Sequence, residues 1–91
     1  MRRGHNFFAH MMEQSSMDAV PGQPIIEIAG DRRVLIENHH GVAAYGSEKI
    51  LVHVKYGSVC ICGCNLEMLH MTKEQLVIYG RIDSVGLQRR R

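Results

Sequence analysis

The chain has 91 residues, of which 45% are hydrophobic and 22% charged, and its formal net charge is +2. A chain of this length forms one small domain and buries only about two thirds of the surface that its unfolded form exposes. No run of residues approaches the roughly 20 apolar positions of a membrane-spanning helix. The arginines at the two ends, in "MRRGH" and "LQRRR", indicate solvated tails, and nucleic acid is the least favoured kind of partner.

Residues 1–20 form an N-terminal tail in which a short helix is predicted. In the stretch "NFFAHMMEQ" the apolar residues Phe7, Phe8, Met11 and Met12 fall at helical spacing, with Asn6 as the N-cap. Such a stripe is more typical of a packing face than of a cofactor-binding box. The following "VPGQP" cannot continue a helix, so the main domain is expected to begin at residue 21.

From residue 21 to residue 87 the apolar pattern has a period of two, which is typical of strands. Polar or glycine-containing turns at Gly30–Asp31, 46–48 and 71–75 separate the extended runs. We therefore predict an all-β domain, a small antiparallel meander of six to eight short strands rolled into a sheet, barrel or sandwich. The similarity between "VCICG" and "LVIYG" leaves a short β-solenoid as the alternative. Residues 88–91 are expected to form a basic C-terminal tail.

Alternation along these strands separates an inner face from an outer one. The residues expected to point inward are Ile50, Val52, Val54, Val59, Ile61, Leu66, Met68, Leu76, Ile78 and Ile82. The outer row of Leu51, Cys60, Val77 and Tyr79 is more apolar than a fully wet face requires. Together with exposed strand edges, this row predicts a surface for assembly with another chain.

All three cysteines, Cys60, Cys62 and Cys64, alternate along one predicted strand, so their side chains share the outer face. Their positions on a straight strand are roughly 7 Å apart, too far for one zinc ion unless a bend at Gly63 gathers them. His53 or His70 would then be the fourth ligand. Cysteines at i and i+2 are poorly placed to bridge one another, which favours a reducing compartment. The simplest interpretation is that the thiols act as small hydrophobes on a partly covered face.

The segment "ENHHG" places Glu37 beside His39 and His40, residue types that suit acid–base catalysis or metal binding. Adjacent strand residues point to opposite faces, so a turn with special backbone angles at Asn38 and Gly41 is the favoured interpretation. No phosphate-binding glycine loop, nucleophile motif or catalytic carboxylate pair is found. We therefore assign no catalytic, cofactor-binding or metal-ligating residues, expect no cofactor and do not expect an enzyme.

The order and spacing of several short motifs resemble the YabP/YqfC family of sporulation proteins, and are closer to the YqfC branch. These motifs are "IENHHG" at 36–41, Gly-x-Asn-Leu-Glu at 63–67, "MTKEQLVIYG" at 71–80 and "GRIDSV" at 80–85, within a resemblance over about residues 18–87. The resemblance implies a role in spore formation in the mother cell, without catalytic activity. It also implies a membrane protein of the sporulation programme as a partner. The cysteines depart from the family, whose members carry polar or basic residues there.

Two functions follow as expectations. The first is a non-enzymatic β-module of spore formation that assembles with itself or with a membrane-associated partner, located in the cytoplasm of the mother cell or peripherally at the forespore membrane. The alternative is a metal-binding or redox-sensing module that uses the row of Cys60, Cys62 and Cys64. No small-molecule substrate is evident from the sequence.

Overall fold

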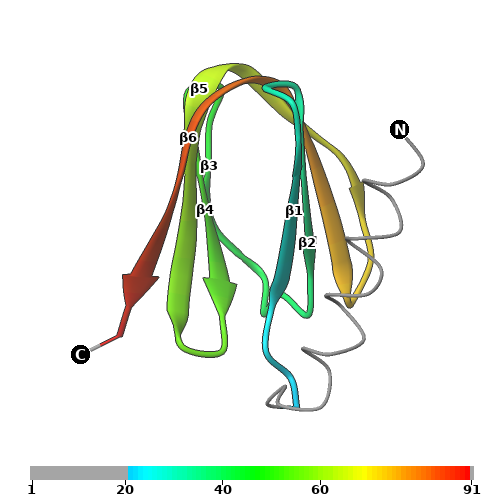
Figure 1. Ribbon diagram of the computed structural model, residues 1–91, viewed down its shortest axis with the longest axis vertical. Coiled ribbons are helices and arrows are strands. Elements are labelled where there is room, and N and C mark those ends of the chain that lie inside the picture. The colour runs from blue at the N-terminus through cyan, green and yellow to red at the C-terminus, as the bar shows by residue number, and fades with distance from the viewer. Residues whose placement is uncertain (1–20, 91) are drawn as a thin grey trace, which may run out of the picture.

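The structure is a computed structural model that describes residues 21–90. These residues form one six-stranded sheet in the order β1-β2-β6-β5-β4-β3, and every neighbouring pair is antiparallel (Figure 1). The strands are β1 (Ile25–Ala29), β2 (Arg33–Glu37), β3 (Val42–Tyr45), β4 (Lys49–Val54), β5 (Gly57–Met71) and β6 (Gln75–Arg89). The predicted antiparallel all-β class is confirmed. The helix predicted within residues 1–20 lies outside the described residues.

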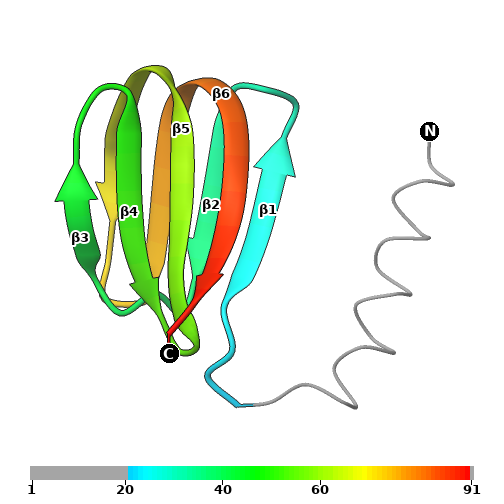
Figure 2. The same cartoon turned by 90° about the vertical axis from the view of Figure 1, so that its left-hand side faces the viewer.

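The sheet is folded over on itself, because its two long central strands bend halfway along their length. β5 and β6 form one hairpin whose register shifts between Cys62 and Gly63 and again between Cys64 and Glu67. On one side of this bend, β4 pairs with residues 57–62 of β5; on the other, β2 pairs with residues 75–79 of β6. The result is two layers that face each other, as the two perpendicular views show (Figures 1 and 2).

Glycine and asparagine make this bend possible. Gly80 has a φ of 141° and Asn65 a φ of 55°, both in the region that ordinary side chains rarely adopt. A side chain at Gly63 would overlap the backbone carbonyl of Arg81 in β6. The strand does bend at Gly63, where the absence of a side chain lets the two backbones approach closely.

The turn between β3 and β4 closes over the bend of β5. The amide of Gly63 donates to the carbonyl of Glu48 at 3.0 Å, and the amide of Leu66 donates to the carbonyl of Ser47 at 2.8 Å. These two bonds satisfy backbone groups that the register shifts remove from the ladder. The bend is therefore held by hydrogen bonds as well as permitted by glycine.

The turn between β1 and β2 closes over the bend of β6 in the same way. The amide of Gly80 donates to the carbonyl of Arg32 at 3.2 Å, and the amide of Ile82 donates to the carbonyl of Asp31 at 2.7 Å. Each short hairpin thus caps one long strand.

The similar segments "VCICG" and "LVIYG" lie in β5 and β6, and each ends in the glycine at which its strand bends. The alternative of a β-solenoid is wrong, because all strand pairs within residues 21–90 are antiparallel.

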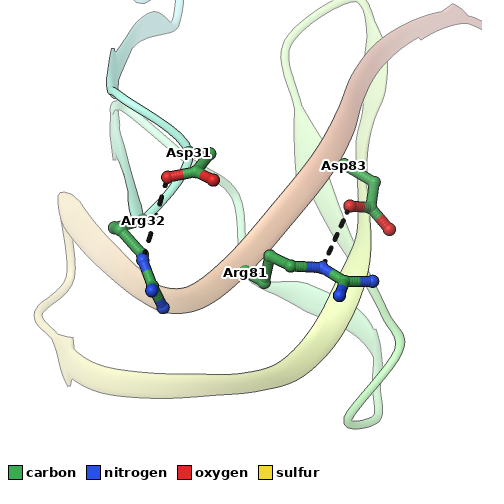
Figure 3. Close-up of polar contacts among 4 residues, drawn as sticks. All are labelled: Asp31, Arg32, Arg81 and Asp83. Carbon is green, nitrogen blue, oxygen red and sulfur yellow. Dashed lines mark ion pairs between the residues drawn. The ribbon is translucent and has the colours of Figure 1, made fainter.

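Two ion pairs lie on the surface in this region, one in the turn between β1 and β2 and one on β6 (Figure 3). Arg32 Nε is 3.8 Å from Asp31 Oδ1, and Arg81 Nε is 3.4 Å from Asp83 Oδ1. All four side chains are more than half exposed, so each pair stabilises the fold by at most about 1 kcal/mol. The backbone hydrogen bonds, rather than these charges, hold the turn in place.

The core lies between the two layers and contains aliphatic side chains from all but the two edge strands. Its members are Val34, Ile36, Ile50, Val52, Val54, Val59, Ile61, Leu66, Leu76, Ile78 and Ile82, and Met68 packs against them. The inner face predicted from alternation is therefore confirmed. Burial of such side chains provides most of the stability of a domain this small.

The outer row is different from the expectation. Leu51 pairs with Cys60 in the layer that contains β4, whereas Val77 and Tyr79 pair with Leu35 and Arg33 of β2 in the other layer. Because the sheet folds over between them, the two halves of the row point away from each other on opposite outer faces. The expectation of one outer row is therefore wrong, because its four residues lie on two faces.

The last strand is longer than the pattern indicated. β6 continues to Arg89, beyond the boundary expected at residue 87. The guanidinium of Arg89 lies over the ring of Tyr56, 5.4 Å from its centroid, which is a cation–π distance. The amide of Arg90 donates to the carbonyl of Tyr56 at 2.8 Å. Part of the terminal arginine cluster is therefore used within the fold.

Candidate functional site

The cysteine row follows the part of β5 that pairs with β4. Cys60 lies between Val59 and Ile61, which are fully buried in the core, so its thiol points to the outer face. It is nevertheless only 9% exposed, while Cys62 is partly exposed. The two Sγ atoms are 3.7 Å apart, closer than the spacing of a straight strand suggests, because the side chains converge. All three cysteines are free thiols.

Burial raises the pKa of the Cys60 thiol above its ordinary value of 9.0. The hydrogen bond and the charge of Cys62 act in the same direction, and the ammonium of Lys49 opposes them. Lys49 is the register partner of Cys62 on β4. The thiol of Cys60 therefore remains protonated at neutral pH, and the more exposed Cys62 is the accessible member of the pair.

Cys64 does not join the first two thiols. It lies beyond the first register shift and pairs with Arg81, and no hydrogen bond joins its sulfur to Cys62. His53 is exposed on β4 and His70 is exposed on the far half of β5. Within residues 21–90 no three side chains of the histidine, cysteine and acidic types come together in a way that would hold a metal ion. The bend at Gly63 separates the cysteines instead of gathering them.

His39 lies in the connection between β2 and β3 and is buried. It is 8% exposed, its Nε2 lies 2.9 Å from the carbonyl of Thr72, and its Nδ1 accepts the amide of Gly41 at 2.9 Å. Because Nδ1 is an acceptor, Nε2 carries the proton and donates to Thr72. His40, by contrast, is exposed. The ring of His39 therefore fastens the β2–β3 connection to the turn between β5 and β6.

The turn predicted for "ENHHG" is confirmed by its backbone angles. Asn38 has a φ of 64° and Gly41 a φ of 108°, and these are the two residues expected to adopt special conformations. The amide of Asn38 donates to the carbonyl of Glu74 at 2.7 Å, and its side-chain Nδ2 donates to the carbonyl of Gln23 at 3.0 Å. The segment crosses from one layer to the other, and the histidines and Glu37 do not form a common site.

The two outermost strands of the sheet differ in how well they are protected. β3 has a bulge between Val42 and Ala44, a common device that prevents strand addition. β1 is regular, and each of its five residues is in register with β2. Its Ile25 is 42% exposed and its Ile28 is 50% exposed, and among residues 21–90 only β2 pairs with it. β1 is therefore the candidate site for pairing with another strand.

A shallow hollow lies beside this edge on the outer face of the same layer. It is lined by Leu35, Gln75, Val77 and Tyr79. Glu27 of β1 and Arg33 of β2 border it with one charge of each sign. A regular edge next to a partly apolar face presents both backbone and side-chain contacts to an incoming strand.

The fold defines a small all-β protein whose single sheet is folded into two layers around one aliphatic core. The sequence profile that describes the YabP family matches residues 22–91, which includes every strand. The chain belongs to the YabP family.

A relative from Bacillus subtilis strain 168, the uncharacterized protein YqfC, is 28% identical to this chain over 68 residues. The alignment covers 75% of this chain and 73% of the relative. No solved structure matches the chain. Among residues 21–90 there is no helix of the length and apolarity that crossing a bilayer requires.

Proposed function

We propose that this protein acts in spore formation as a non-enzymatic module that assembles, with itself or with a membrane-associated partner, through the edge of β1. Membership of the YabP family supports the link to sporulation. The observation that supports assembly is the regular, apolar edge strand with half-exposed Ile28. Its location in this proposal is the cytoplasm of the mother cell or, peripherally, the forespore membrane.

Edge strands carry a row of unpaired amides and carbonyls, and a strand from another chain satisfies them by continuing the ladder. β1 has no proline and only one charged residue, Glu27, so little opposes such pairing. Protein–protein recognition by strand addition draws affinity from main-chain bonds and specificity from side-chain contacts. On the outer face, side chains of the added strand would lie beside Ile25 and Glu27 of β1, and Glu27 also borders the hollow.

A lysine on an edge strand blocks strand addition because it must keep its charge in water. We therefore compare the full-length protein with Ile28→Lys by light scattering over a range of concentrations. In parallel, each protein is used to capture membrane proteins from solubilised sporulating cells. The proposal expects wild type to form an oligomer or to capture a membrane protein, and Ile28→Lys to lose this interaction.

The matched control is Leu69→Lys. Leu69 is 60% exposed and lies on the half of β5 at the opposite edge of the same layer, away from β1. It should behave as wild type, and circular dichroism checks that both variants keep the β fold. A wild-type protein that is monomeric at every concentration and captures no membrane protein would contradict the proposal. Equal loss in both variants would contradict a specific role for β1, since Leu69 lies on the other edge of this layer.

A further inference from the structure

Among the cysteines of residues 21–90, Cys60 and Cys62 contact each other, and their sulfurs are 3.7 Å apart. They lie on the outer face of β5, directly before the register shift at Gly63. We propose that these two residues form a redox-active dithiol, which closes to an intrastrand disulfide when it meets a low-molecular-weight disulfide. This inference does not depend on the proposed function in assembly.

The backbone spacing lies at the edge of what a disulfide accepts. Residues i and i+2 on a strand are roughly 6.6 Å apart, and bridged cysteines have Cα separations up to about 6.8 Å. Bringing the sulfurs from 3.7 Å to bonding distance requires each to move by roughly 0.8 Å, and the strand must also pucker to bring the Cβ atoms within about 4.5 Å. A bridge at the upper end of this range is strained, and strained bridges are the easily reduced, regulatory ones. The pair therefore suits reversible oxidation rather than permanent cross-linking.

The two thiols take different steps in the disulfide exchange because they differ in exposure. Cys62 is partly exposed and reacts first: its thiolate attacks one sulfur of the small disulfide RSSR and expels RS⁻, which leaves a mixed disulfide on Cys62. Cys60 then loses its proton and attacks the Cys62 sulfur, which expels the second RS⁻. The two protons released by the cysteines end on the two RSH products. In sum, two protein thiols are oxidised and one RSSR is reduced.

Cys64 provides the control within the same strand, because it is partly exposed and lies beyond the register shift. In Cys64→Ser the contacting pair is kept. In Cys62→Ser the remaining thiols, Cys60 and Cys64, are separated by the bend. In Cys60→Ser the first attack can occur, but no neighbouring thiol is present to resolve the mixed disulfide.

The experiment incubates each fully reduced, folded variant with oxidised glutathione as the probe, and then measures intact mass after alkylation in denaturant. For Cys64→Ser we expect loss of two thiols with neither glutathione nor alkyl group added. For Cys60→Ser we expect stable glutathione adducts, and for Cys62→Ser no internal bridge. Circular dichroism confirms folding, and the alanine variant at the same position replaces any serine variant that does not fold.

The proposal is overturned if Cys64→Ser accumulates glutathione on Cys62 while Cys60 remains open to alkylation. It is also overturned if Cys62→Ser closes an internal bridge as readily as Cys64→Ser does, since the contact at 3.7 Å would then have no special role. Closure confined to the variant that retains both Cys60 and Cys62 supports it.

Discussion

Gly63 of β5 lies against the backbone carbonyl of Arg81 in β6, with no room for a Cβ atom between them. At this position the two long strands cross the fold line of the sheet, and the amide of Gly63 turns away to the carbonyl of Glu48. The two-layered architecture therefore depends on the absence of a side chain at Gly63, as it does at Gly80 on the other long strand.

Gly63→Ala should destabilise the protein strongly. The new methyl group overlaps the Arg81 carbonyl, so the hairpin must open at its bend or lose the bond to Glu48. We expect a decrease of about 2–4 kcal/mol in the free energy of unfolding, measured by urea denaturation. Gly86→Ala is the matched control, because a Cβ there meets no atom within 4 Å. An equal decrease in both variants would show that glycine content, and not the close approach, is responsible.

The core prediction concerns two neighbours on β6. Ile78 is fully buried, whereas Val77 is partly exposed on the outer face. Ile78→Ala should lower the free energy of unfolding by about 2–5 kcal/mol because it leaves a cavity between the layers. Val77→Ala should lower it by less than half of that amount. Similar values for the two would mean that the sheet is not folded around Ile78, and thermal and urea denaturation would detect this.

A further prediction compares the two adjacent histidines. His39→Ala leaves the Thr72 carbonyl and the Gly41 amide without their ring partners, which should lower the free energy of unfolding by about 1–3 kcal/mol. His40→Ala, at an exposed position, should have little effect. In the wild type, nitrogen NMR at mildly alkaline pH should find the proton of His39 on Nε2. A proton on Nδ1 would contradict the bond from Gly41.

The thiols should differ in their pH-dependent reactivity. Burial and the neighbouring Cys62 raise the pKa of Cys60 above 9.0, and only the thiolate reacts with iodoacetamide. At pH 8, Cys60 should therefore be alkylated more slowly than Cys62 or Cys64, and its rate should still be rising as the pH passes 9.0. Peptide mapping after timed alkylation of the folded protein measures the three rates. A rate for Cys60 that levels off below pH 9.0 would exclude the raised pKa.

The same shift affects stability at alkaline pH. Between 9.0 and the raised pKa of Cys60, the unfolded chain releases this proton while the folded chain keeps it, so stability falls as pH rises. Relative to Cys60→Ala, the wild type should therefore lose stability above pH 9.0 and not below it. Urea denaturation at pH 7, 9 and 10 measures this difference. A wild type that gains stability over this interval would show that the sign is wrong.

The sequence by itself determined the local and alternating features of this protein. A period of two placed Ile50, Val52 and Val54 on the inner face, because successive strand side chains point to opposite sides regardless of how the strands assemble. The special angles at Asn38 and Gly41 were predictable for a similar reason, since conformational freedom is a property of the residue itself. The family, too, followed from motifs that are contiguous in the chain.

The tertiary structure alone decided which surfaces exist. Alternation could not reveal that Cys60 and Val77 lie on opposite outer faces, because this depends on the bend that turns one layer over the other. It could not identify β1 as a regular outermost strand of residues 21–90, because strand order depends on which distant segments pair. The contact between Cys60 and Cys62 was also hidden, since the convergence of two side chains depends on the local geometry of the bent strand and its neighbours.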